Sequence, residues 1–324
     1  MQVLWLENQK IIVRDVPAPV PSGGQALIQM NMAGICSTDL ELLHGYYPYS
    51  GIPGHEFVGR VVSSPSDSSW EGKRVVGEIN IACGNCEMCR SGLTRHCTYR
   101  KTLGIHDWQG AFAEYLILPL SNLHRIPDNL PDDIAVFTEP TAAACEILEQ
   151  VEIGPKDRVL IIGAGKLGQL VAQVLHTTGC NLLVITRHEK QKELLQQQHI
   201  PSQSVNELSQ AKFDLVIEAT GSPEGLLLAK KYIRSRGKIV LKSTYRGEIS
   251  LNISQFVVDE VTIIGSRCGS FQPALELLSE RKVNPIPLIE GVYPMHQAIE
   301  AFQQAAVPGV LKILLKPDLV DIHK

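Results

Sequence analysis

Four cysteines in one short segment have the spacing of a metal site. They follow the pattern C-x2-C-x2-C-x7-C in the run CGNCEMCRSGLTRHC and are Cys83, Cys86, Cys89 and Cys97. Such spacing lets a single loop surround a tetrahedral ion, and zinc is the ion that four thiolates usually hold. Because four protein ligands leave no open position, the pattern predicts a structural zinc rather than a catalytic one.

Two other uses of a four-cysteine cluster fit the chain less well. Disulfides need an exported protein, whereas the first residues, MQVLWLENQKI, lack the basic and apolar segments of a signal peptide, so we expect a cytoplasmic protein. A zinc ribbon for nucleic acid needs a basic surface, but 30 Lys and Arg against 34 Asp and Glu give a net charge of -4. No apolar run is long enough to cross a bilayer. We therefore expect neither nucleic acid nor membrane as a partner.

A glycine-rich turn predicts a dinucleotide site. Gly163, Gly165 and Gly168 form G-x-G-x-x-G directly after the apolar run RVLII and directly before a helical run. The first glycine permits a tight turn, the second lets the backbone approach a pyrophosphate, and the third allows close packing of helix and strand. Lys166 and Leu167 belong to the same predicted site, where a helix N-terminus faces the phosphate charge.

The residues after the second predicted strand favour NADP(H) over NAD(H). An Asp or Glu about 20 residues beyond the glycines would hold the ribose 2'-hydroxyl. This chain has Thr186, Arg187 and His188 there instead. No carboxylate would repel a 2'-phosphate, and Arg187 could pair with it. The alternative is that Arg187 is a solvated surface cation and that NAD is accepted without the acidic contact.

Two further runs contain side chains that can bind metals, Cys36 in AGICSTDLELLHG and His55 with Glu56 in IPGHEFVGR. A lone His, however, is usually a satisfied surface or core group rather than a metal ligand. Each run is modest support alone. Together with the cysteine lobe and the glycine turn, the combination is specific.

The elements around these motifs predict an α/β protein of about two domains. Up to about residue 140, short β-type runs are broken by Pro and Gly, as in an irregular β barrel. From about residue 141, helices alternate with apolar strands, which indicates a parallel sheet covered on both faces. The segment after about residue 273 is expected to pack on the first domain.

Near the ends of the predicted parallel strands, where such sheets bind ligands, lie Thr220, Ser243, Thr244 and Ser266.

In combination, the motifs resemble the zinc-dependent medium-chain alcohol dehydrogenase family. GICSTD, GHEFVGR, the cysteine lobe, GAFAEY, TEPTAAA and GAGKLG occur in family order and cover nearly the whole chain. The resemblance implies a GroES-like catalytic β-barrel domain over residues 1–141 and 273–324, and a Rossmann domain with a doubly wound parallel sheet over residues 142–272. It also implies a homodimer or homotetramer.

The resemblance further implies which residues hold the catalytic zinc. Cys36 and His55 match its two fixed ligands. Glu56 and Glu139 match the carboxylate ligands of the branch that includes sorbitol and threonine dehydrogenases, so each chain would hold two zinc ions. Asp39 matches a carboxylate that orients the imidazole of His55, although it could instead cap a helix.

The proton path is less complete than in many relatives. Thr38 matches the hydroxyl that contacts the substrate oxygen, but Glu41 stands where those relatives have a His three residues further along. Either Glu41 or His44 could carry the proton outward, and both could simply face solvent.

The predicted function is the oxidation of a polyol, an amino alcohol or a simple alcohol by NAD(P)+. One alternative is an NADPH-dependent aldehyde or ketone reductase that works in the opposite direction. A second alternative is a non-catalytic sensor or scaffold that retains the zinc and dinucleotide sites. The joint presence of Cys36, Thr38, His55 and Glu139 argues against that second alternative, because a scaffold does not need an open zinc site.

Overall fold

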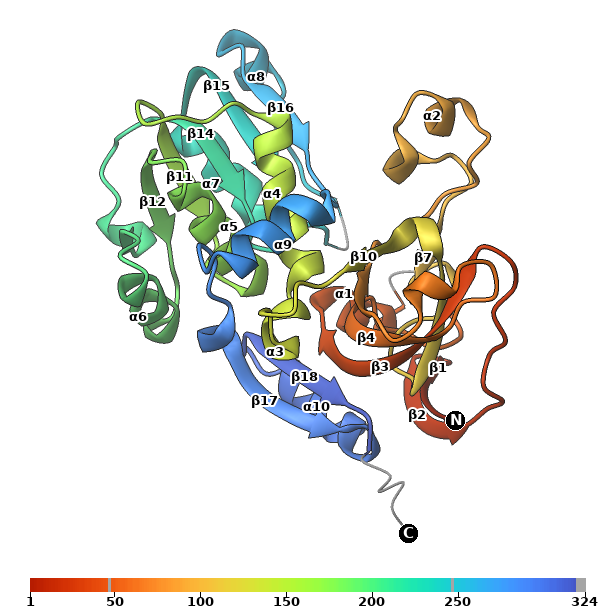
Figure 1. Ribbon diagram of the computed structural model, residues 1–324. Coiled ribbons are helices and arrows are strands. Elements are labelled where there is room, and N and C mark those ends of the chain that lie inside the picture. Colours follow the sequence, from red (N-terminus) through yellow and green to blue (C-terminus); the bar gives the residue numbers. More distant parts are fainter. Residues whose placement is uncertain (46–47, 246–247, 319–324) are drawn as a thin grey trace. The chain divides into compact units, whose positions relative to one another are not determined.

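The structure is a computed structural model that describes residues 1–45, 48–245 and 248–318. The chain forms two compact units (Figure 1). The first comprises Met1–Glu139 and Leu288–Lys324, and the second comprises Pro140–Pro287. Over the described residues, no helix has the length and the apolar character needed to span a membrane.

The first unit is built on a seven-stranded sheet in which the long strand β3 is central. Across the sheet the strands are β10 (Leu123–Arg125), β5 (Arg74–Gly77), β4 (Glu56–Ser63), β3 (Gln25–Ile35), β18 (Lys312–Lys316) and β17 (Ile289–Pro294), with β9 (Tyr115–Pro119) also on β3. The first half of β3 pairs with β9 and its last residues pair with β18. The late chain segment, blue in Figure 1, therefore completes a sheet begun near the N-terminus.

The burial pattern of β3 explains this position. Ala26, Ile28 and Met30 are buried and alternate with more exposed residues, as expected for a strand with one face on the core. The last three residues of the strand, Ala33 to Ile35, are all buried, so this end is covered on both faces. In the core of the same unit, the rings of Phe112 and Phe302 meet edge to face with centroids 5.7 Å apart.

Smaller elements complete the first unit. The hairpin β1 (Gln2–Glu7) and β2 (Lys10–Asp15) and the small sheet β6 (Asn80–Ile81), β7 (Lys101–Leu103) and β8 (Asp107–Trp108) are separate from the main sheet. The helices are α1 (Ser37–Leu43), α2 (Glu87–Arg90), α3 (Asp132–Ala135) and α10 (Ala298–Ala305).

The second unit is a six-stranded sheet in which every pair is parallel. The strand order is β13 (Ser202–Gln203), β12 (Asn181–Ile185), β11 (Arg158–Ile162), β14 (Phe213–Glu218), β15 (Ile233–Leu241) and β16 (Thr262–Gly265). The accompanying helices are α4 (Thr138–Gln150), which begins at the end of the first unit, α5 (Lys166–His176), α6 (Glu189–Gln197), α7 (Pro223–Tyr232), α8 (Ser254–Val258) and α9 (Phe271–Ser279). Strand β11 lies inside the sheet, and four of its five residues are buried, which accounts for its unbroken apolar run.

The boundary between the units differs from the boundary expected from the sequence. Helix α9 belongs to the second unit, and only the segment from Leu288 onward joins the first. Between α9 and Leu288, Asn284 exchanges two hydrogen bonds with Gln173 of α5, at 2.7 and 3.3 Å. These contacts between distant residues could not be seen in the local pattern, which placed the boundary at residue 273.

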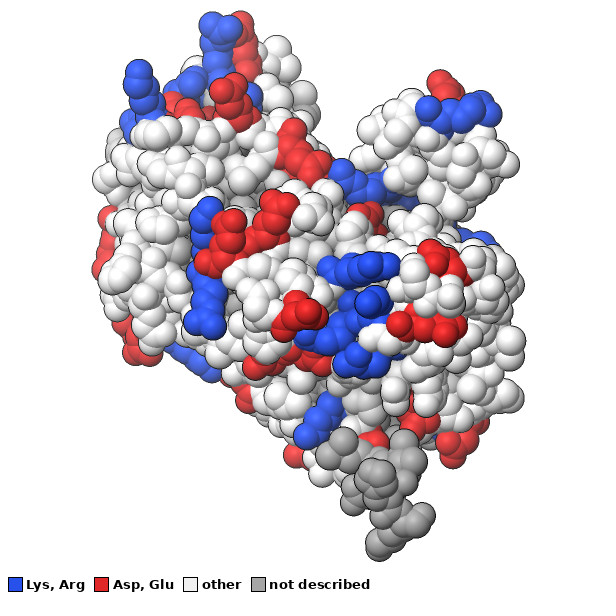
Figure 2. Space-filling model, viewed as in Figure 1, with Lys and Arg blue, Asp and Glu red and all other residues white. Residues whose placement is uncertain are grey.

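Charged side chains are mixed over the surface. Figure 2 shows Lys and Arg lying among Asp and Glu over the described residues of the face drawn, rather than collected into one broad basic surface. This distribution agrees with the small net charge of the chain and gives no support to a nucleic-acid interface on that face.

A glycine that allows close packing within the second unit provides a test of this fold. A Cβ atom at Gly269 would lie 1.9 Å from the carbonyl oxygen of Ala142 in α4, so the backbones must separate if the side chain grows. We expect Gly269→Ala to lower the free energy of unfolding by about 2 kcal/mol, as overpacking commonly does. Urea unfolding followed by circular dichroism measures this change. Gly154→Ala is the matched control, because a Cβ there meets no atom within 4 Å; equal losses for the two variants would contradict the packing argument.

Candidate active site

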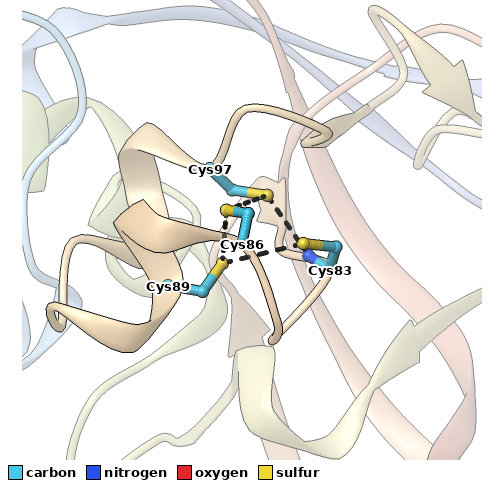
Figure 3. A group of neighbouring side chains, drawn as sticks. All are labelled: Cys83, Cys86, Cys89 and Cys97. Carbon is cyan, nitrogen blue, oxygen red and sulfur yellow. Dashed lines mark hydrogen bonds between the residues drawn. The ribbon is translucent and has the colours of Figure 1, made fainter.

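The four lobe cysteines lie together around a common centre. Their side chains point toward one another from the ends of α2 and the loops beside it (Figure 3), and their sulfurs all lie within 4.8 Å of each other. The Sγ atom of Cys86 is 3.4 Å from that of Cys89 and 3.7 Å from that of Cys97. Four thiolates around one zinc would be about 3.8 Å apart, which follows from a Zn–S bond of about 2.3 Å in tetrahedral geometry. The donor set therefore fits zinc.

The backbone of the lobe favours the thiolate form of one of these cysteines. Hydrogen bonds from the backbone N–H of Cys89 and then from that of Thr98 lower the pKa of Cys86 to about 6. Because thiolates rather than thiols bind metals, a cysteine that is already ionised near neutral pH suits a metal ligand.

A second group of ligand atoms lies where β3, α1 and β4 meet. One atom each of Cys36, His55 and Glu56 lies within 4.8 Å of the others. Cys36 directly follows β3 and is the N-cap residue of α1, and Glu56 begins β4. In the antiparallel ladder Glu56 pairs with Gly34 of β3, so the register of the two strands brings the three residues together. His55 and Glu56 are buried.

Asp39 both caps the helix and faces the histidine. Its Oδ2 accepts a hydrogen bond of 2.8 Å from the backbone N–H of Cys36, while its Oδ1 lies 3.4 Å from Nδ1 of His55. Burial by itself would lower the pKa of His55, but the negative charge of the nearby Asp39, together with Cys36, outweighs it and raises that pKa well above its ordinary value. The two roles that the sequence left open for Asp39 are therefore compatible.

Other residues predicted for this site lie at different distances from it. The hydroxyl of Thr38 is 3.8 Å from the sulfur of Cys36. Glu139, in the first turn of α4, is not among the ligand atoms that lie within 4.8 Å of each other. Glu41, partly exposed on α1, and His44, the exposed C-cap residue of that helix, have Oε1 and Nδ1 4.0 Å apart.

Lys312 also belongs to this site, whereas the sequence suggested only a contact to the cofactor phosphates or a solvated surface cation. Its ammonium group is buried and forms an ion pair with the Oε2 atom of Glu56. Burial alone would lower the pKa of Lys312, but the charges of Glu56 and Cys36, and more weakly that of Glu139, raise it. A single lysine at the start of the apolar run KILL was the only available signal, and it does not indicate which distant carboxylate the lysine meets.

The glycine turn of the second unit has the geometry that its sequence predicts. It connects β11 to α5, and Gly163 has a φ of +104°, which favours glycine. A Cβ at Gly168 would lie 2.0 Å from the carbonyl oxygen of Gly163, whereas one at Gly165 would meet nothing within 4 Å. The open side at Gly165 leaves room for a ligand to approach the backbone, and Lys166 and Leu167 form the first turn of α5.

The residues after β12 divide into one buried and two exposed side chains. Thr186 is buried, whereas Arg187 and His188 are exposed, and His188 is the N-cap residue of α6. The pKa of Glu224, at the start of α7, is lowered first by hydrogen bonding to its own backbone and by Ser222, and less strongly by the charge of Arg187. Arg187 is therefore an exposed cation that interacts electrostatically with the carboxylate of Glu224.

Glu218, at the end of β14, is a buried residue that sequence reasoning also missed. Its Oε1 accepts hydrogen bonds from Thr220 Oγ1 at 2.6 Å, from Thr220 N at 2.7 Å and from Ser243 Oγ at 3.0 Å. The same Ser243 oxygen accepts a bond of 2.7 Å from the backbone N–H of Gly221. The predicted cofactor residues Thr220 and Ser243 thus belong to one network that fixes two neighbouring strand ends.

The remaining two predicted cofactor residues differ in exposure. Ser266, directly after β16, is buried, and its Oγ accepts a hydrogen bond of 3.2 Å from Lys242 Nζ. Thr244 is exposed three residues beyond the end of β15. Both follow strands at the carboxyl edge of the parallel sheet, where the glycine turn also lies.

Known protein families match both units. Residues 22–128 match the family model of the alcohol dehydrogenase GroES-like domain. Residues 146–242 match a model described as shikimate / quinate 5-dehydrogenase. This second match spans β11 to β15 and so covers most of the parallel sheet.

Curated relatives match over most of their length. The chain is 31% identical to an L-threonine 3-dehydrogenase of Edwardsiella ictaluri, over 80% of this chain and 81% of the relative. It is 30% identical to an uncharacterized zinc-type alcohol dehydrogenase-like protein of Haemophilus influenzae, over 89% and 90%. It is 29% identical to a sorbitol dehydrogenase of Halalkalibacterium halodurans, over 94% and 95%.

Solved structures agree with these matches. An Escherichia coli alcohol dehydrogenase (rspB) complexed with NADH has a TM-score of 0.89 and 27% identity, with 98% of this chain and 99% of that chain covered. A Sinorhizobium meliloti zinc-binding dehydrogenase bound to NADP has a TM-score of 0.89 and 25% identity over 98% and 99%. The first unit is accordingly a GroES-like domain and the second a Rossmann domain. The protein is an enzyme that oxidises or reduces a small-molecule substrate of the alcohol class with a nicotinamide cofactor, and the chain belongs to the zinc-type medium-chain alcohol dehydrogenase family.

Proposed function

We propose that the protein is a zinc-dependent dehydrogenase that transfers hydride between an alcohol and NAD(P)+. The observation that carries this proposal is a group of a partly buried thiol, a buried imidazole and a buried carboxylate within 4.8 Å of one another. Three protein ligands of these types are typical of a catalytic zinc with an open position. When bound there, zinc supplies a Lewis acid that lowers the pKa of a substrate hydroxyl.

The residues of the first unit have separate tasks in this proposal. Asp39 holds Nδ1 of His55, which leaves Nε2 for the metal and fixes the orientation of the ring. Cys36 supplies a thiolate, and Glu56 or Glu139 supplies the carboxylate. The hydroxyl of Thr38, beside the sulfur of Cys36, is placed to accept the proton of the substrate hydroxyl. From there the partly exposed Glu41 of α1, or the exposed His44 directly after α1, carries the proton to solvent.

The cysteine lobe would hold a second zinc with a structural role. Its sulfur separations fit a closed tetrahedral site, and the four-residue helix α2 inside it has no buried residue with which to fold by packing. Because these four thiols must remain reduced to bind metal, we place the chain in a reducing compartment such as the cytoplasm.

The exposed side chain of Arg187 supports NADP(H) as the preferred cofactor. It follows β12, at the position where an acidic residue would otherwise select NAD.

We also propose a homo-oligomer. Strand β16 ends the parallel sheet with Ile263 41% exposed, and the preceding helix α8 exposes Val257 and Val258 by 69% and 81%. An open strand edge with apolar neighbours favours pairing with a second copy.

Metal content tests the two zinc sites separately. We expect the wild-type protein to contain two zinc ions per chain, and Cys36→Ser to lose one of them together with its dehydrogenase activity, because the thiolate of Cys36 is a catalytic ligand. Inductively coupled plasma mass spectrometry measures the zinc. Cys180→Ala is the control, since Cys180 is buried away from both ligand groups and should keep both ions. Retention of two ions by Cys36→Ser would exclude the assigned catalytic site.

Cofactor choice tests the role of Arg187. Arg187→Asp removes the partner of a 2'-phosphate and adds a repelling charge, so we expect the Kd for NADPH to rise about tenfold or more while that for NADH changes little, since a hydrogen bond to a charged group contributes roughly 1.5–3 kcal/mol. Fluorescence titration gives both constants. Lys190→Asp, with the same change of charge in the nearby helix α6, measures the general field effect. An unchanged ratio of the two constants in Arg187→Asp would remove the basis for preferring NADP.

The reaction itself is tested with a substrate panel. Polyols, amino alcohols, simple alcohols and the corresponding aldehydes and ketones are assayed with each cofactor by the absorbance of the reduced nicotinamide. We expect oxidation of at least one alcohol class, with loss of turnover after zinc removal by a chelator and recovery with added Zn2+. Turnover only with carbonyl compounds and NADPH would favour the reductase alternative, and no turnover with any compound would favour a sensor or scaffold.

A further inference from the structure

The carboxylate of Glu56 has two competing neighbours. One of its oxygens lies within 4.8 Å of donor atoms of Cys36 and His55. Its Oε2 forms an ion pair with the ammonium group of Lys312, and the two side chains are only 2% and 3% exposed. A carboxylate in this position can serve the cation on the protein or the metal beside it. Whether the carboxylate of Glu56 pairs with Lys312 or binds the metal depends on what holds it toward Lys312.

Strand register provides a place for this carboxylate beside Lys312. Gly34 of β3 pairs with Glu56 of β4 on one side and with Leu314 of β18 on the other. Lys312 lies two residues before Leu314 and therefore on the same face of β18. A Cβ at Gly34 would lie only 2.4 Å from Oε2 of Glu56. The missing side chain of Gly34 thus leaves the space that the carboxylate occupies.

The electrostatic effect of Lys312 acts in the same direction. A buried cation beside this ligand group attracts the carboxylate of Glu56 strongly and repels an added divalent cation, because charges interact more strongly where water is excluded. Phe137 limits the other side of the lysine, with its ring centre 5.6 Å from Nζ. Lys312 is consequently held near Glu56 and not near solvent.

We propose that Lys312 is a positioning residue that holds Glu56 in the space over Gly34 and thereby keeps one position of the catalytic zinc exchangeable. This inference rests on the proposed function, since it concerns the same metal site. Without the lysine, Glu56 would turn fully to the metal and occupy the position that substrate and water must share. The consequence is a zinc ion that is bound more tightly and a site that is less open.

The rate of zinc release tests this role without any measurement of activity. Zinc-loaded protein is mixed with an excess of a chromogenic chelator, and the phase that is absent in Cys36→Ser is assigned to the catalytic site. We expect Lys312→Met to slow this phase about tenfold, which is the scale on which residues around a ligand set change metal affinity. Lys312→Arg retains the charge and should release zinc at nearly the wild-type rate. Lys316→Met, on the same strand but exposed, should have no effect. A phase as fast as wild type, or faster, in Lys312→Met overturns the proposal.

Two further variants separate positioning from other effects. Gly34→Ala fills the space over β3 while the charge of Lys312 remains, so it should also slow the release phase. If Lys312→Met does not fold, Gly34→Ala still tests the positioning role. In a protein that already carries Glu56→Gln, Lys312→Met should slow zinc release much less, because the uncharged amide no longer pairs with the lysine. The same slowing in both backgrounds would show direct charge repulsion and reject the positioning role, as would unchanged release in Gly34→Ala.

Failure of this inference differs from failure of the proposed function. A protein inactive on the whole substrate panel, but with slowed zinc release in Lys312→Met, would refute the dehydrogenase assignment and retain the positioning role. An active dehydrogenase in which Lys312→Met releases zinc at the wild-type rate would retain the dehydrogenase assignment and refute the positioning role.

Discussion

The antiparallel pairing of β3 with β4 and β18 is the constraint on which the candidate metal site of the first unit depends. Cys36 follows β3, His55 precedes β4, Glu56 begins β4 and Lys312 begins β18, so hydrogen bonds between three strands place four chemically different side chains around one point. A slip of one residue in either ladder would turn Glu56 or Lys312 to the opposite face of the sheet. The buried residues at the end of β3 oppose such a slip, because it would expose apolar side chains.

The same arrangement concentrates charge where there is little water. Asp39, Glu56 and Lys312 are each at most 3% exposed, and His55 lies beside Asp39. Burial of ionised groups costs several kcal/mol each unless opposite charges and hydrogen bonds compensate for it. Here the compensation comes in pairs, Asp39 with His55 and Glu56 with Lys312. The sheet around these pairs holds them in place, so binding of the proposed metal ion would be linked to folding stability.

Local motifs were predictable from the sequence, and contacts between distant segments were not. The four lobe cysteines lie within one loop, and the glycine turn joins adjacent elements, so their spacing alone determined their geometry. The side chains of Asp39 and His55 come from nearby segments, and the family resemblance sufficed to relate them. By contrast, Lys312 is 256 residues from Glu56, and only the β18 to β3 pairing brings the two together. The place of α9 was missed for the same reason, because the residues on either side of it make the distant contacts, Gly269 with Ala142 of α4 and Asn284 with Gln173 of α5.

The carboxylate of Glu218 has a consequence for how the second unit recognises its cofactor. By accepting three hydrogen bonds from Thr220 and Ser243, it ties the loops after β14 and β15 into a single arrangement before any ligand arrives. Loops that are already ordered lose little conformational entropy on association. A dinucleotide bound at the proposed position would then not need to order these loops, and it would meet a site that is already formed.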